Sequence, residues 1–575
     1  MGKNLVRNQK ALERNLNRSV DIETFVNSDD VFVAWRASKP IEDCVGFELR
    51  RERNGKLEVV RNRISFSGGE PDPTTPESSA TSPLRRYTWT DHEANTGDKV
   101  AYQVVPVIQP DGGDAAVDET QASKFSTEVE LSGEIDDTFE CYFNRGLVIS
   151  QFMSRQLKGD FSAKSLKAFK QGLNDATESK IRLFLGGDLR TRMMDLLDET
   201  KKNKGHVFAA LFELSDEVLI SKLTGLGKRA HIVLSNGAHT SKADDENADS
   251  RKTLNDAGCE VHDRMLASGI LGHNKFMVVC DANQAPQAAW TGSTNWSPTG
   301  LCTQINNGIL IHDGGVAQVL FDQWGRLRDA EDATPKDLVA ANSKVKLKKT
   351  KSADVDIWFT KTSGAPEMDA VNELVKNAKE GIIFLMFQPG GSPILNAVID
   401  RQADDAGLFV KCVISTMDKN DLDQAKVTLI QRGDKKVAKF RIVQPQGLQS
   451  VGKWAAEVSR GAFLNQIGFA IVHSKVIVID PNGKNPIVVT GSHNFSAAAS
   501  SKNDENLVIS GNKALAKAYA VEVQSIFDHY NFRAVAASMK ADGKDVSKLM
   551  LDPKAWQGAW FRGDKQLELN FWLGK

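Results

Sequence analysis

Apolar and polar positions alternate along the chain from residue 21 to about residue 132. The clearest alternating stretches are residues 31–35, 45–53, 85–91 and 99–108. Alternation with a period of two places every second side chain on one face of a strand, and turn-rich sequence separates these stretches. The segment is therefore predicted to form short antiparallel strands in a β-sandwich, with Trp35 in its core and Tyr102 in a tyrosine corner.

From about residue 140 the pattern changes, and apolar strands alternate with amphipathic helices. Residues 193–237 predict the order helix, strand, helix, strand, and residues 367–418 repeat it. Alternation of this kind is typical of layered α/β domains, in which helices cover a sheet. We expect two α/β halves of similar construction.

A set of polar residues follows each half in the same order. The first set is His273, Lys275, Asp281, Ser293 and Asn295, and the second set is His473, Lys475, Asp480, Ser492 and Asn494. In both sets the serine and the asparagine belong to Gly-Ser-x-Asn, and the aspartate stands twelve residues before the serine. A single His-x-Lys often occurs by chance on a strand, but chance is a poor explanation for two copies in this register.

The two copies differ in one spacing. Lys275 and Asp281 are six residues apart, whereas Lys475 and Asp480 are five residues apart. One additional residue in a strand turns every later side chain to the opposite face unless a β-bulge absorbs it. A bulge is therefore predicted between residues 276 and 280.

The repeated pattern resembles the signature of the phospholipase D superfamily, in which H-x-K-x(4)-D precedes G-S-x-N, usually twice. The resemblance covers residues 140 to 535, and the first copy departs from it by the one inserted residue. It implies two pseudo-twofold-related α/β halves, with layered sheets and flanking helices, that bring both motifs into one cleft. The alternating N-terminal segment is similar to a fibronectin type III domain. The expected fold is therefore multidomain, with a β-sandwich before the two α/β domains.

These patterns divide the chain into five segments. They are an N-terminal tail (1–20), a fibronectin type III-like sandwich (21–135), two phospholipase D-like repeats (136–345 and 346–540) and an aromatic-rich C-terminal segment (541–575). For the C-terminal aromatic cluster, packing on the last domain is favoured over contact with a membrane. Residues 344–351 carry five lysines, which favour a solvated linker over a contact with nucleic-acid phosphates or anionic lipid.

The repeated residue types suit the chemistry of a phosphodiester. Lysines and asparagines supply charge and fixed donors around the phosphate oxygens, and a histidine nitrogen can attack phosphorus to give a covalent phospho-histidine. A second histidine can protonate the leaving oxygen and later activate water or an alcohol. The serines can donate hydroxyls or cap the turn, and the aspartates can act in the site or hold a turn. The resemblance implies this mechanism without a metal, so no cofactor is expected.

The two copies also differ eleven residues after the last asparagine. Glu505 stands there after the second copy, and Asn306 after the first. A carboxylate on the far ring nitrogen of a histidine fixes its tautomer and raises its basicity. Glu505 is therefore expected to orient His473, which makes His473 the expected nucleophile and His273 the expected acid.

Composition excludes several classes of protein. The 73 basic and 74 acidic residues leave a net charge of −1, so no overall field marks a nucleic-acid binder. No apolar stretch has the length of a transmembrane helix or signal peptide. The six cysteines lie far apart without C-x-x-C spacing, which is typical of reduced thiols in a cytosolic protein. We expect a cytoplasmic protein, with contact at a membrane surface as an option.

Three functions are compatible with these features. The leading hypothesis is a phospholipase D-like hydrolase that cleaves phospholipid or transfers its phosphatidyl group to an alcohol. The rival is a metal-independent nuclease, because members of the superfamily also cut nucleic acid with these motifs. The third is a catalytically weak binding protein whose sandwich domain recruits a protein partner. The sequence leaves the headgroup preference and the oligomeric state open.

Overall fold

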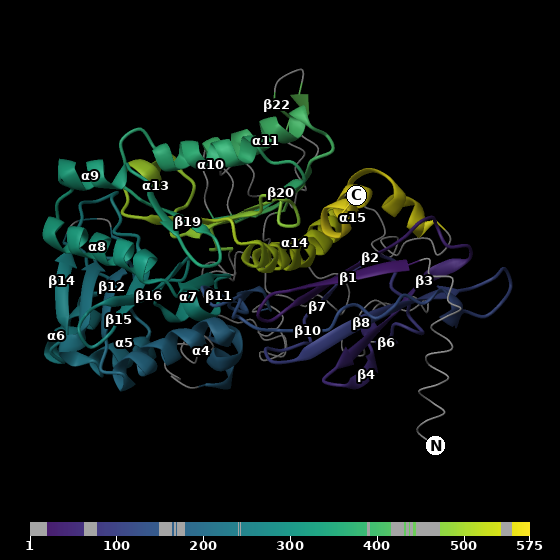
Figure 1. Cartoon of the computed structure of the whole chain (residues 1–575), viewed down its shortest axis with the longest axis horizontal. Helices are drawn as coiled ribbons and strands as arrows, with labels where there is room; N and C mark the ends of the chain where they lie inside the picture. Colours follow the sequence, from purple (N-terminus) through teal and green to yellow (C-terminus); the bar gives the residue numbers. More distant parts are fainter. Residues whose placement is uncertain are drawn as a thin grey trace. The chain divides into compact units, whose positions relative to one another are not determined.

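The chain forms two compact units, whose elements are labelled in Figure 1. Unit 1 comprises residues 1–132, 449–456 and 535–575, and unit 2 comprises residues 133–448 and 457–534. The computed structural model describes residues 20–62, 77–148, 179–387, 392–415, 472–541 and 555–574, apart from residues 240 and 242, with isolated positions at 164–168 and 431–443. The predicted N-terminal tail therefore lies outside the described residues, except for Val20.

Unit 1 contains two antiparallel sheets around one hydrophobic core. The first has the order β1 (Val20–Val26), β2 (Val31–Ala37), β7 (Thr88–Asp91), and the second has the order β10 (Val129–Glu130), β8 (Lys99–Ile108), β3 (Cys44–Arg53), β4 (Lys56–Val59), with β9 (Ala116–Val117) also on β8. The strands β5 (Arg61–Asn62) and β6 (Glu77–Ser78) form a separate pair. Trp35 is fully buried, as predicted, and its ring meets the edge of Phe47 at 5.6 Å.

Tyr102 is buried, but it does not make the backbone hydrogen bond of the expected tyrosine corner. Its hydroxyl donates to the carboxylate of Asp91 at 2.7 Å. The same carboxylate pairs with the guanidinium of Arg51 at 2.6 Å. Burial, reinforced by the Asp91 charge, holds the pKa of Tyr102 well above its usual value. Tyr102 therefore links strands β8, β7 and β3 through a buried charge pair.

The C-terminal aromatic segment belongs to unit 1. It consists of a 3₁₀-helix, η7 (Trp556–Phe561), and the helix α15 (Gly563–Leu573). The indole of Trp556 donates to the carbonyl of Cys44 at 2.9 Å, and its ring meets the edge of Phe47 at 5.8 Å. The prediction that this segment packs on the last domain is therefore wrong. Aromatic composition indicates that a segment must be buried, but it does not identify the core that receives it.

Unit 2 contains two large sheets whose strands follow the same order. The first is β11 (Phe139–Phe143), β17 (Asn307–Ile311), β16 (Pro286–Gly292), β15 (Lys275–Cys280), β12 (His206–Leu211), β13 (Ala230–Ser235) and β14 (Glu260–Arg264). The second is β18 (Lys346–Lys349), β19 (Asp354–Phe359), β27 (Asn506–Ser510), β26 (Ile487–Gly491), β25 (Val476–Ile479), β20 (Gly381–Met386), β21 (Phe409–Ile414) and β24 (Arg441–Val443). Apart from β18, every strand of the second sheet has a counterpart in the first. The motif strands β15 and β25 therefore lie inside their sheets, away from both edges.

The pairing of β15 with β16 is irregular within the range where a bulge was predicted. The register is regular from Met277 to Val279 and then shifts between Val279 and Cys280. Strand β25 pairs with β26 without a shift. At the shift in the first sheet the partner changes from Ala288 to Pro286, so the unpaired residue is Gln287 of β16, while β15 pairs with β12 without a shift. The predicted bulge in β15 is therefore wrong: the residue that the first copy has in excess lengthens the strand, which runs to Cys280.

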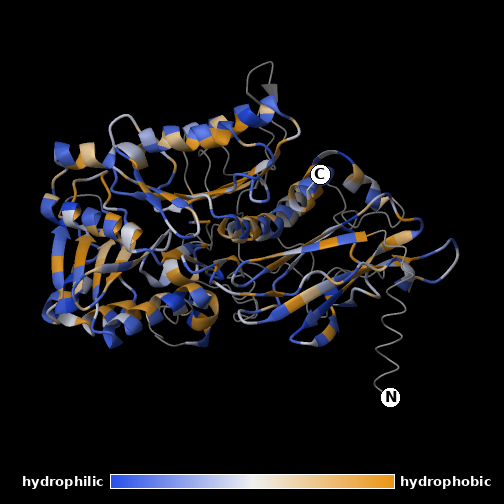
Figure 2. Ribbon diagram, in the orientation of Figure 1, coloured by the Kyte–Doolittle hydropathy of each residue, from blue (hydrophilic) through white to orange (hydrophobic). Residues whose placement is uncertain are grey.

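Helices cover both faces of each sheet. Those of the first half are α4 (Lys180–Lys202), α5 (Glu217–Thr224), α6 (Ala248–Asp256), α7 (Pro298–Cys302) and α8 (Gly314–Ala330); those that follow are α9 (Lys336–Asn342), α10 (Pro366–Lys376), α11 (Pro393–Asp404), α13 (Ala497–Ser501) and α14 (Lys513–Ala541). Val207 and Ala209 of β12 face the core under α4 and α5, whereas Phe208 between them packs on Trp324 of α8. The orange strands of Figure 2, flanked by helices with mixed faces, follow this division. The predicted order of helix, strand, helix, strand is confirmed in both halves.

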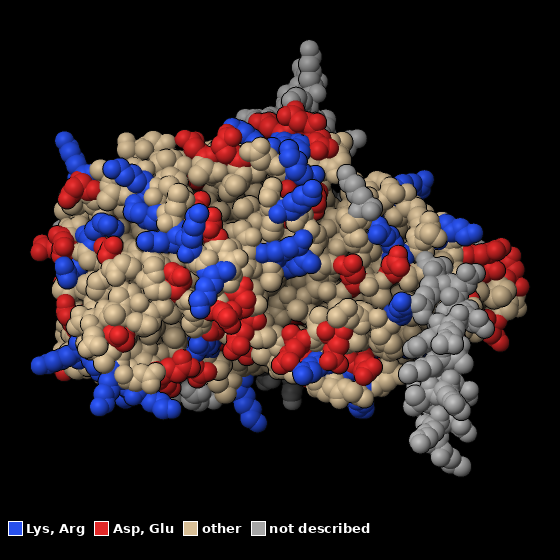
Figure 3. Space-filling model, viewed as in Figure 1, with Lys and Arg blue, Asp and Glu red and all other residues tan. Residues whose placement is uncertain are grey.

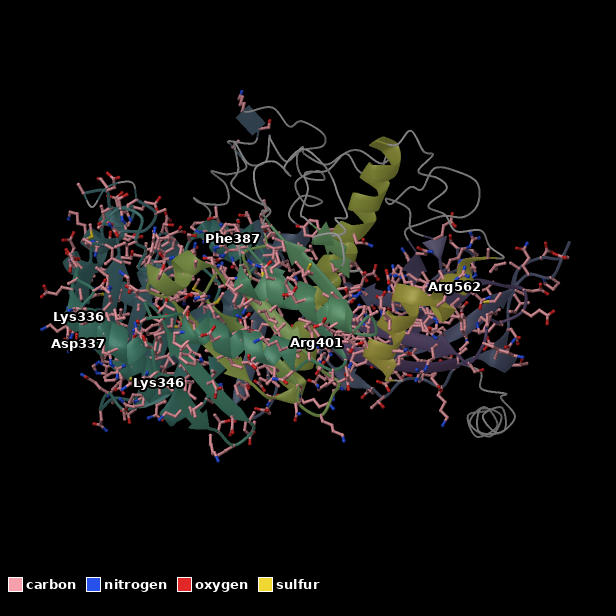
Figure 4. All side chains as sticks on the ribbon, turned by 90° about the horizontal axis from the view of Figure 1, so that it is seen from above. Lys336, Asp337, Lys346, Phe387, Arg401 and Arg562 are labelled. Carbon is pink, nitrogen blue, oxygen red and sulfur yellow. The ribbon has the colours of Figure 1, made fainter. Side chains whose placement is uncertain are left out.

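The lysine-rich segment is an edge strand, and not the linker that its composition favoured. Strand β18 pairs with β19 at the margin of the second sheet. The ammonium of Lys346 donates to the carbonyl of Ala341 at 2.6 Å. Charged side chains on an edge strand discourage pairing with another chain. Figure 4 shows Lys346 well away from Phe387, which follows β20 inside the same sheet.

The surface and the thiols add little chemistry of their own. Lys and Arg side chains intermix with Asp and Glu over the face drawn in Figure 3. All six cysteines are buried and none forms a disulfide. In the part of the chain that the structure describes, no helix is both long and apolar enough to span a bilayer.

Replacing Trp556 with Ala should lower the free energy of unfolding of unit 1 by about 3–5 kcal/mol, because it removes a large ring from a closed core. Thermal and urea unfolding followed by tryptophan fluorescence would measure the change. The control is Gln566→Ala, at an exposed position of α15. Equal stability of the two variants would show that the C-terminal segment does not complete the core.

Candidate active site

Each motif histidine lies just before its strand, inside unit 2. His273 precedes β15 and His473 precedes β25, and only 5% and 4% of their surfaces are exposed. The backbone amides of His473 and Ser474 both donate to the carbonyl of Ile305 at 2.9 Å, so the first half positions the second motif. Nδ1 of His473 lies 3.0 Å from the carbonyl of Ser293 in the first motif, so the two motifs meet at His473.

Glu505 contacts His273, and not His473 as predicted. Its Oε2 lies 2.7 Å from His273 Nδ1, and its Oε1 accepts a hydrogen bond from Asn503 at 3.2 Å. Glu505 is fully buried at the start of β27. The segment before β27 contacts the first half here, since the amide of Asp504 donates to the carbonyl of Leu271 at 2.8 Å. Spacing within one half therefore does not reveal the partner. The assignment of His473 as nucleophile therefore loses its basis.

Asn306 is the counterpart of Glu505, and its side chain reaches from the first half to His473 of the second half. Its Oδ1 lies 2.9 Å from His473 Nδ1, and the carbonyl of Ser293 lies 3.0 Å from the same nitrogen. Because both partners of this nitrogen are acceptors, Nδ1 of His473 carries the proton and Nε2 carries the lone pair. The Glu505 carboxylate fixes the same tautomer on His273. Each half thus holds the histidine of the other at Nδ1, and no described residue makes a hydrogen bond to either Nε2.

A second reciprocal pair of contacts joins the halves beside the histidines. Asn307 donates to the hydroxyl of Thr490 at 2.9 Å. Asn506 donates to the hydroxyl of Thr291 at 2.6 Å. These four residues stand at equivalent places in the two copies, one after the orienting group and two before the serine. The interface between the halves is therefore built from the same segments that build the site.

The two lysines have matching surroundings. The ammonium of Lys275 donates to the carbonyl of His273 at 2.7 Å, and Lys475 makes the same bond to the carbonyl of His473. Lys275 lies 4.8 Å from the ring centre of Phe212, and Lys475 lies 5.2 Å from that of Phe387. The negative face of an aromatic ring attracts an ammonium group, so each phenylalanine helps to hold its lysine without a directly bonded carboxylate.

The phenylalanines also pack on the histidines. Phe212 lies 4.7 Å from the ring of His273, and Phe387 lies 5.0 Å from the ring of His473, both in edge contact. Sequence reasoning missed these residues. The signal was present, because a phenylalanine ends the equivalent apolar strand in both halves.

The motif serines bond to the segments that carry the orienting residues. Ser293 donates to Asn306 Oδ1 at 2.7 Å, which fixes the amide that holds His473. Ser492 accepts the backbone amide of Asn506 at 2.9 Å. Of the two roles considered for the serines, these contacts match support of the turn.

The motif asparagines have unequal partners. Asn295 donates to Glu213 Oε2 at 2.9 Å, while its own Oδ1 is buried with no hydrogen-bond partner. The Oδ1 of Asn494 is likewise buried without a partner. Sequence reasoning missed Glu213, because the first half carries it after Phe212 whereas the second half has Gln388 in its place.

The motif aspartates lie at the opposite end of their strands from the histidines. Asp480 follows β25 and accepts the backbone amides of Lys379, Glu380 and Gly381 at 2.7–2.9 Å. Asp281 follows β15 and accepts the amides of residues 283 and 285. Their inclusion among the catalytic residues is therefore corrected, since a strand separates them from the histidines. They hold the loops at the ends of the strands that lie away from the histidines.

Burial sets the protonation of the histidines. It lowers the pKa of His273 to about 4, and the Glu505 carboxylate only partly opposes this effect. Burial also lowers the pKa of His473 well below its usual value, and the charges of Lys475 and Lys275 lower it further. The histidine beside the carboxylate is therefore the more basic of the two.

The lysines respond to burial in the same direction. Burial lowers the pKa of Lys275 to about 7, against the opposing charges of Glu505 and Glu213. It lowers the pKa of Lys475 well below its usual value. Cationic groups that are this poorly hydrated gain strongly from an anion placed among them. Within the described residues, no group of three His, Cys, Asp or Glu side chains is arranged to hold a metal ion.

Comparisons with known proteins agree with this chemistry. The family described as "Cardiolipin synthase, PLD-like domain" matches residues 371–527. A phospholipase D of Rickettsia bellii is 30% identical over 167 residues, which make up 29% of this chain and 65% of that protein. The chain therefore spans slightly less than two thirds of the length of this relative.

Solved structures with similar segments include a phosphatidylserine synthase of Haemophilus influenzae, with 11% identity, a TM-score of 0.38 and coverage of 60% of this chain and 85% of that one. They also include the phospholipase D family member Nuc of Salmonella typhimurium, with 24% identity, a TM-score of 0.18 and coverage of 31% and 95%. The family match covers residues 371–527, the part of the chain that contains the second motif.

Proposed function

We propose that this protein is a phosphodiesterase of the phospholipase D type, which hydrolyses a phospholipid or transfers its phosphatidyl group to an alcohol. The observation that carries the proposal is the pair of buried histidines, each held at Nδ1 by the other half and without a hydrogen bond to any described residue at Nε2. Two buried lysines beside them can neutralise the phosphate and stabilise the charge that develops on its oxygens.

In the first step, Nε2 of His273 attacks phosphorus, and the bond from phosphorus to the leaving oxygen breaks. The leaving oxygen keeps the electron pair and takes a proton from Nε2 of His473. Positive charge develops on the phosphorylated ring, where the Glu505 carboxylate at Nδ1 stabilises it. For this reason we assign His273 as the nucleophile.

His473 suits the role of acid. Its Nδ1 faces only neutral carbonyl oxygens, so its protonated form is less stabilised and gives up the proton more readily. The incoming phosphate anion favours protonation of this ring. In the second step, neutral His473 takes a proton from water or an alcohol, whose oxygen attacks phosphorus. The bond to His273 then breaks and its electron pair returns to Nε2.

Phospholipid is the proposed substrate class, and nucleic acid is the alternative that the test must separate. The matched family and relative carry names from phospholipid chemistry. A net charge of −1 and the mixed surface charges of Figure 3 offer little attraction for a polyanion. A protein of this kind would meet its substrate at a membrane surface.

We further propose that the two halves of unit 2 are related by a pseudo-twofold axis, as their equal strand order and reciprocal contacts suggest. Unit 1 is proposed to be a fibronectin type III-like sandwich that docks a protein partner. Its buried ionisable residues join strands of the core, which favours a scaffold role over chemistry.

Covalent trapping should place the phosphoryl group on His273. With a nitrophenyl phosphodiester, whose leaving group departs without protonation, His473→Asn should still give a burst of nitrophenol of about one per site. His273→Asn should give no burst. The reaction is quenched without acid, because phospho-histidine is labile in acid. Mass spectrometry should then find the adduct in the peptide that contains His273.

The matched control for this trapping is Glu505→Gln, which keeps the shape of the side chain and removes its charge. It should slow the burst by about 10²–10³-fold without changing the position of the adduct. An adduct on the peptide that contains His473 would reverse the assignment of the two histidines.

Substrate class can be decided with choline-headgroup liposomes, single-stranded DNA and double-stranded DNA assayed side by side with chelator present. Release of headgroup without cleavage of DNA is expected, and His273→Asn should abolish it. Cleavage of DNA alone would make the protein a nuclease. Loss of all activity on addition of chelator would contradict the two-histidine mechanism.

Binding of an anion should take up protons. Because burial lowers the pKa of Lys275 to about 7, this lysine is largely neutral at about pH 8, and an anion raises its pKa again. Affinity for tungstate should therefore increase as the pH falls from about 8 to about 7. Calorimetry in buffers of different ionisation enthalpy measures the protons directly. Proton release, or less uptake in the wild type than in Lys275→Met, would contradict this account.

A further inference from the structure

Glu213 lies beside the nucleophile, although no motif contains it. It follows β12 and Phe212, whose ring contacts His273 at 4.7 Å. The backbone carbonyl of Glu213 accepts the amide of Trp296 at 3.2 Å, which joins this turn to the Gly-Ser-x-Asn segment. Its position is therefore fixed by the same elements that fix the site.

One oxygen of the Glu213 carboxylate is anchored and the other is open. Oε2 accepts hydrogen bonds from Asn295 at 2.9 Å and from Ser297 at 3.4 Å. Oε1 makes no hydrogen bond to any described residue. Burial raises the pKa of Glu213, and the charge of Lys275 opposes this rise. The ionised carboxylate acts on both Lys275 and Lys475, yet no ion pair within 4.0 Å joins it to either lysine. The carboxylate thus acts on the charges of the site without forming a direct ion pair with either lysine.

The charges of the site explain why this carboxylate matters. Lys275 and Lys475 supply the positive charge, and Glu505 is committed to His273. Glu213 therefore reduces the attraction of the site for anions without serving a histidine. The second half has the neutral Gln388 at the equivalent place in the sequence, so the repeat supplies one such carboxylate and not two.

We infer that Glu213 is a specificity-determining residue that matches the site to a singly charged phosphodiester and disfavours a doubly charged phosphomonoester. The inference rests on the proposed function and deepens it. Hydrolysis converts a monoanionic diester into a monoester that becomes a dianion near neutral pH. A fixed carboxylate repels the second charge more than the first and so promotes release of the product.

The size of the effect follows from charge counting. When one protein charge is removed, a dianion loses about two repulsive interactions, whereas a monoanion loses about one. At an effective dielectric constant near 20 and a separation within one site, each interaction is worth on the order of tenfold in affinity. The ratio of the two affinities should therefore change by about tenfold.

The test compares phenylphosphonate, a dianion at alkaline pH, with its monomethyl ester, a monoanion of nearly the same shape. Binding is measured by calorimetry in the His273→Asn background, so that no turnover occurs. Glu213→Gln keeps an oxygen that can accept from Asn295 and removes the charge. Thermal unfolding of this variant checks that the fold is intact.

Glu246→Gln is the matched control, because Glu246 is a neighbouring carboxylate whose Oε2 accepts the backbone amide of Ala238 at 2.8 Å. Glu213→Gln should raise the preference for the dianion about tenfold, and Glu246→Gln should leave the preference nearly unchanged. In turnover assays, Glu213→Gln should also strengthen inhibition by the monoester product.

Two other results are informative. If Glu213→Gln changes both affinities by the same factor, Glu213 is a structural anchor for Asn295 and the inference is overturned while the proposed function stands. If neither phosphonate binds even before Glu213 is changed, the site does not hold a phosphoryl group. That result overturns the proposed function together with the inference.

Discussion

The contact between His273 and Glu505 is the interaction on which the site depends. It joins a ring from the first half to a carboxylate from the second, and both groups are buried. A buried carboxylate without a partner is costly, so this pair can form only when the halves close on each other. The arrangement proposed to be catalytic is therefore a property of the interface, since each histidine is held by the other half.

Burial explains both the stability and the chemistry of this arrangement. Taking two lysines and two histidines out of water lowers the pKa of each, which opposes folding. The same loss of water strengthens every interaction with an anion that enters. Reciprocal contacts, such as that between Asn307 and Thr490, hold the halves in place against the unfavourable term. Burial of these groups thus makes the core less stable, and it also fixes the donors so that they need no rearrangement when substrate binds.

Features that depend on local periodicity could be predicted from the sequence. The burial of Trp35 and the order of helices and strands follow from spacing along one segment. The prediction of a bulge in β15 was wrong, because the additional residue could also be accommodated by a longer strand. The partner of Glu505 could not be predicted, because it lies 232 residues away across an interface. Glu213 was not predicted as a site residue because the second half has Gln388, and not a carboxylate, at the equivalent position. Phe212 and Phe387 were detectable, because both end equivalent strands.

The exchange of orienting groups between the halves can be measured directly by proton–nitrogen NMR of protein labelled with ¹⁵N only in histidine. The Nδ1 proton of a histidine bonded to a buried carboxylate is strongly deshielded, and His→Asn variants assign each signal. In Glu505→Gln the Nδ1 signal of His273 should lose its deshielding while that of His473 keeps its position. A shift of the His473 signal with an unchanged His273 signal would contradict the crossed arrangement.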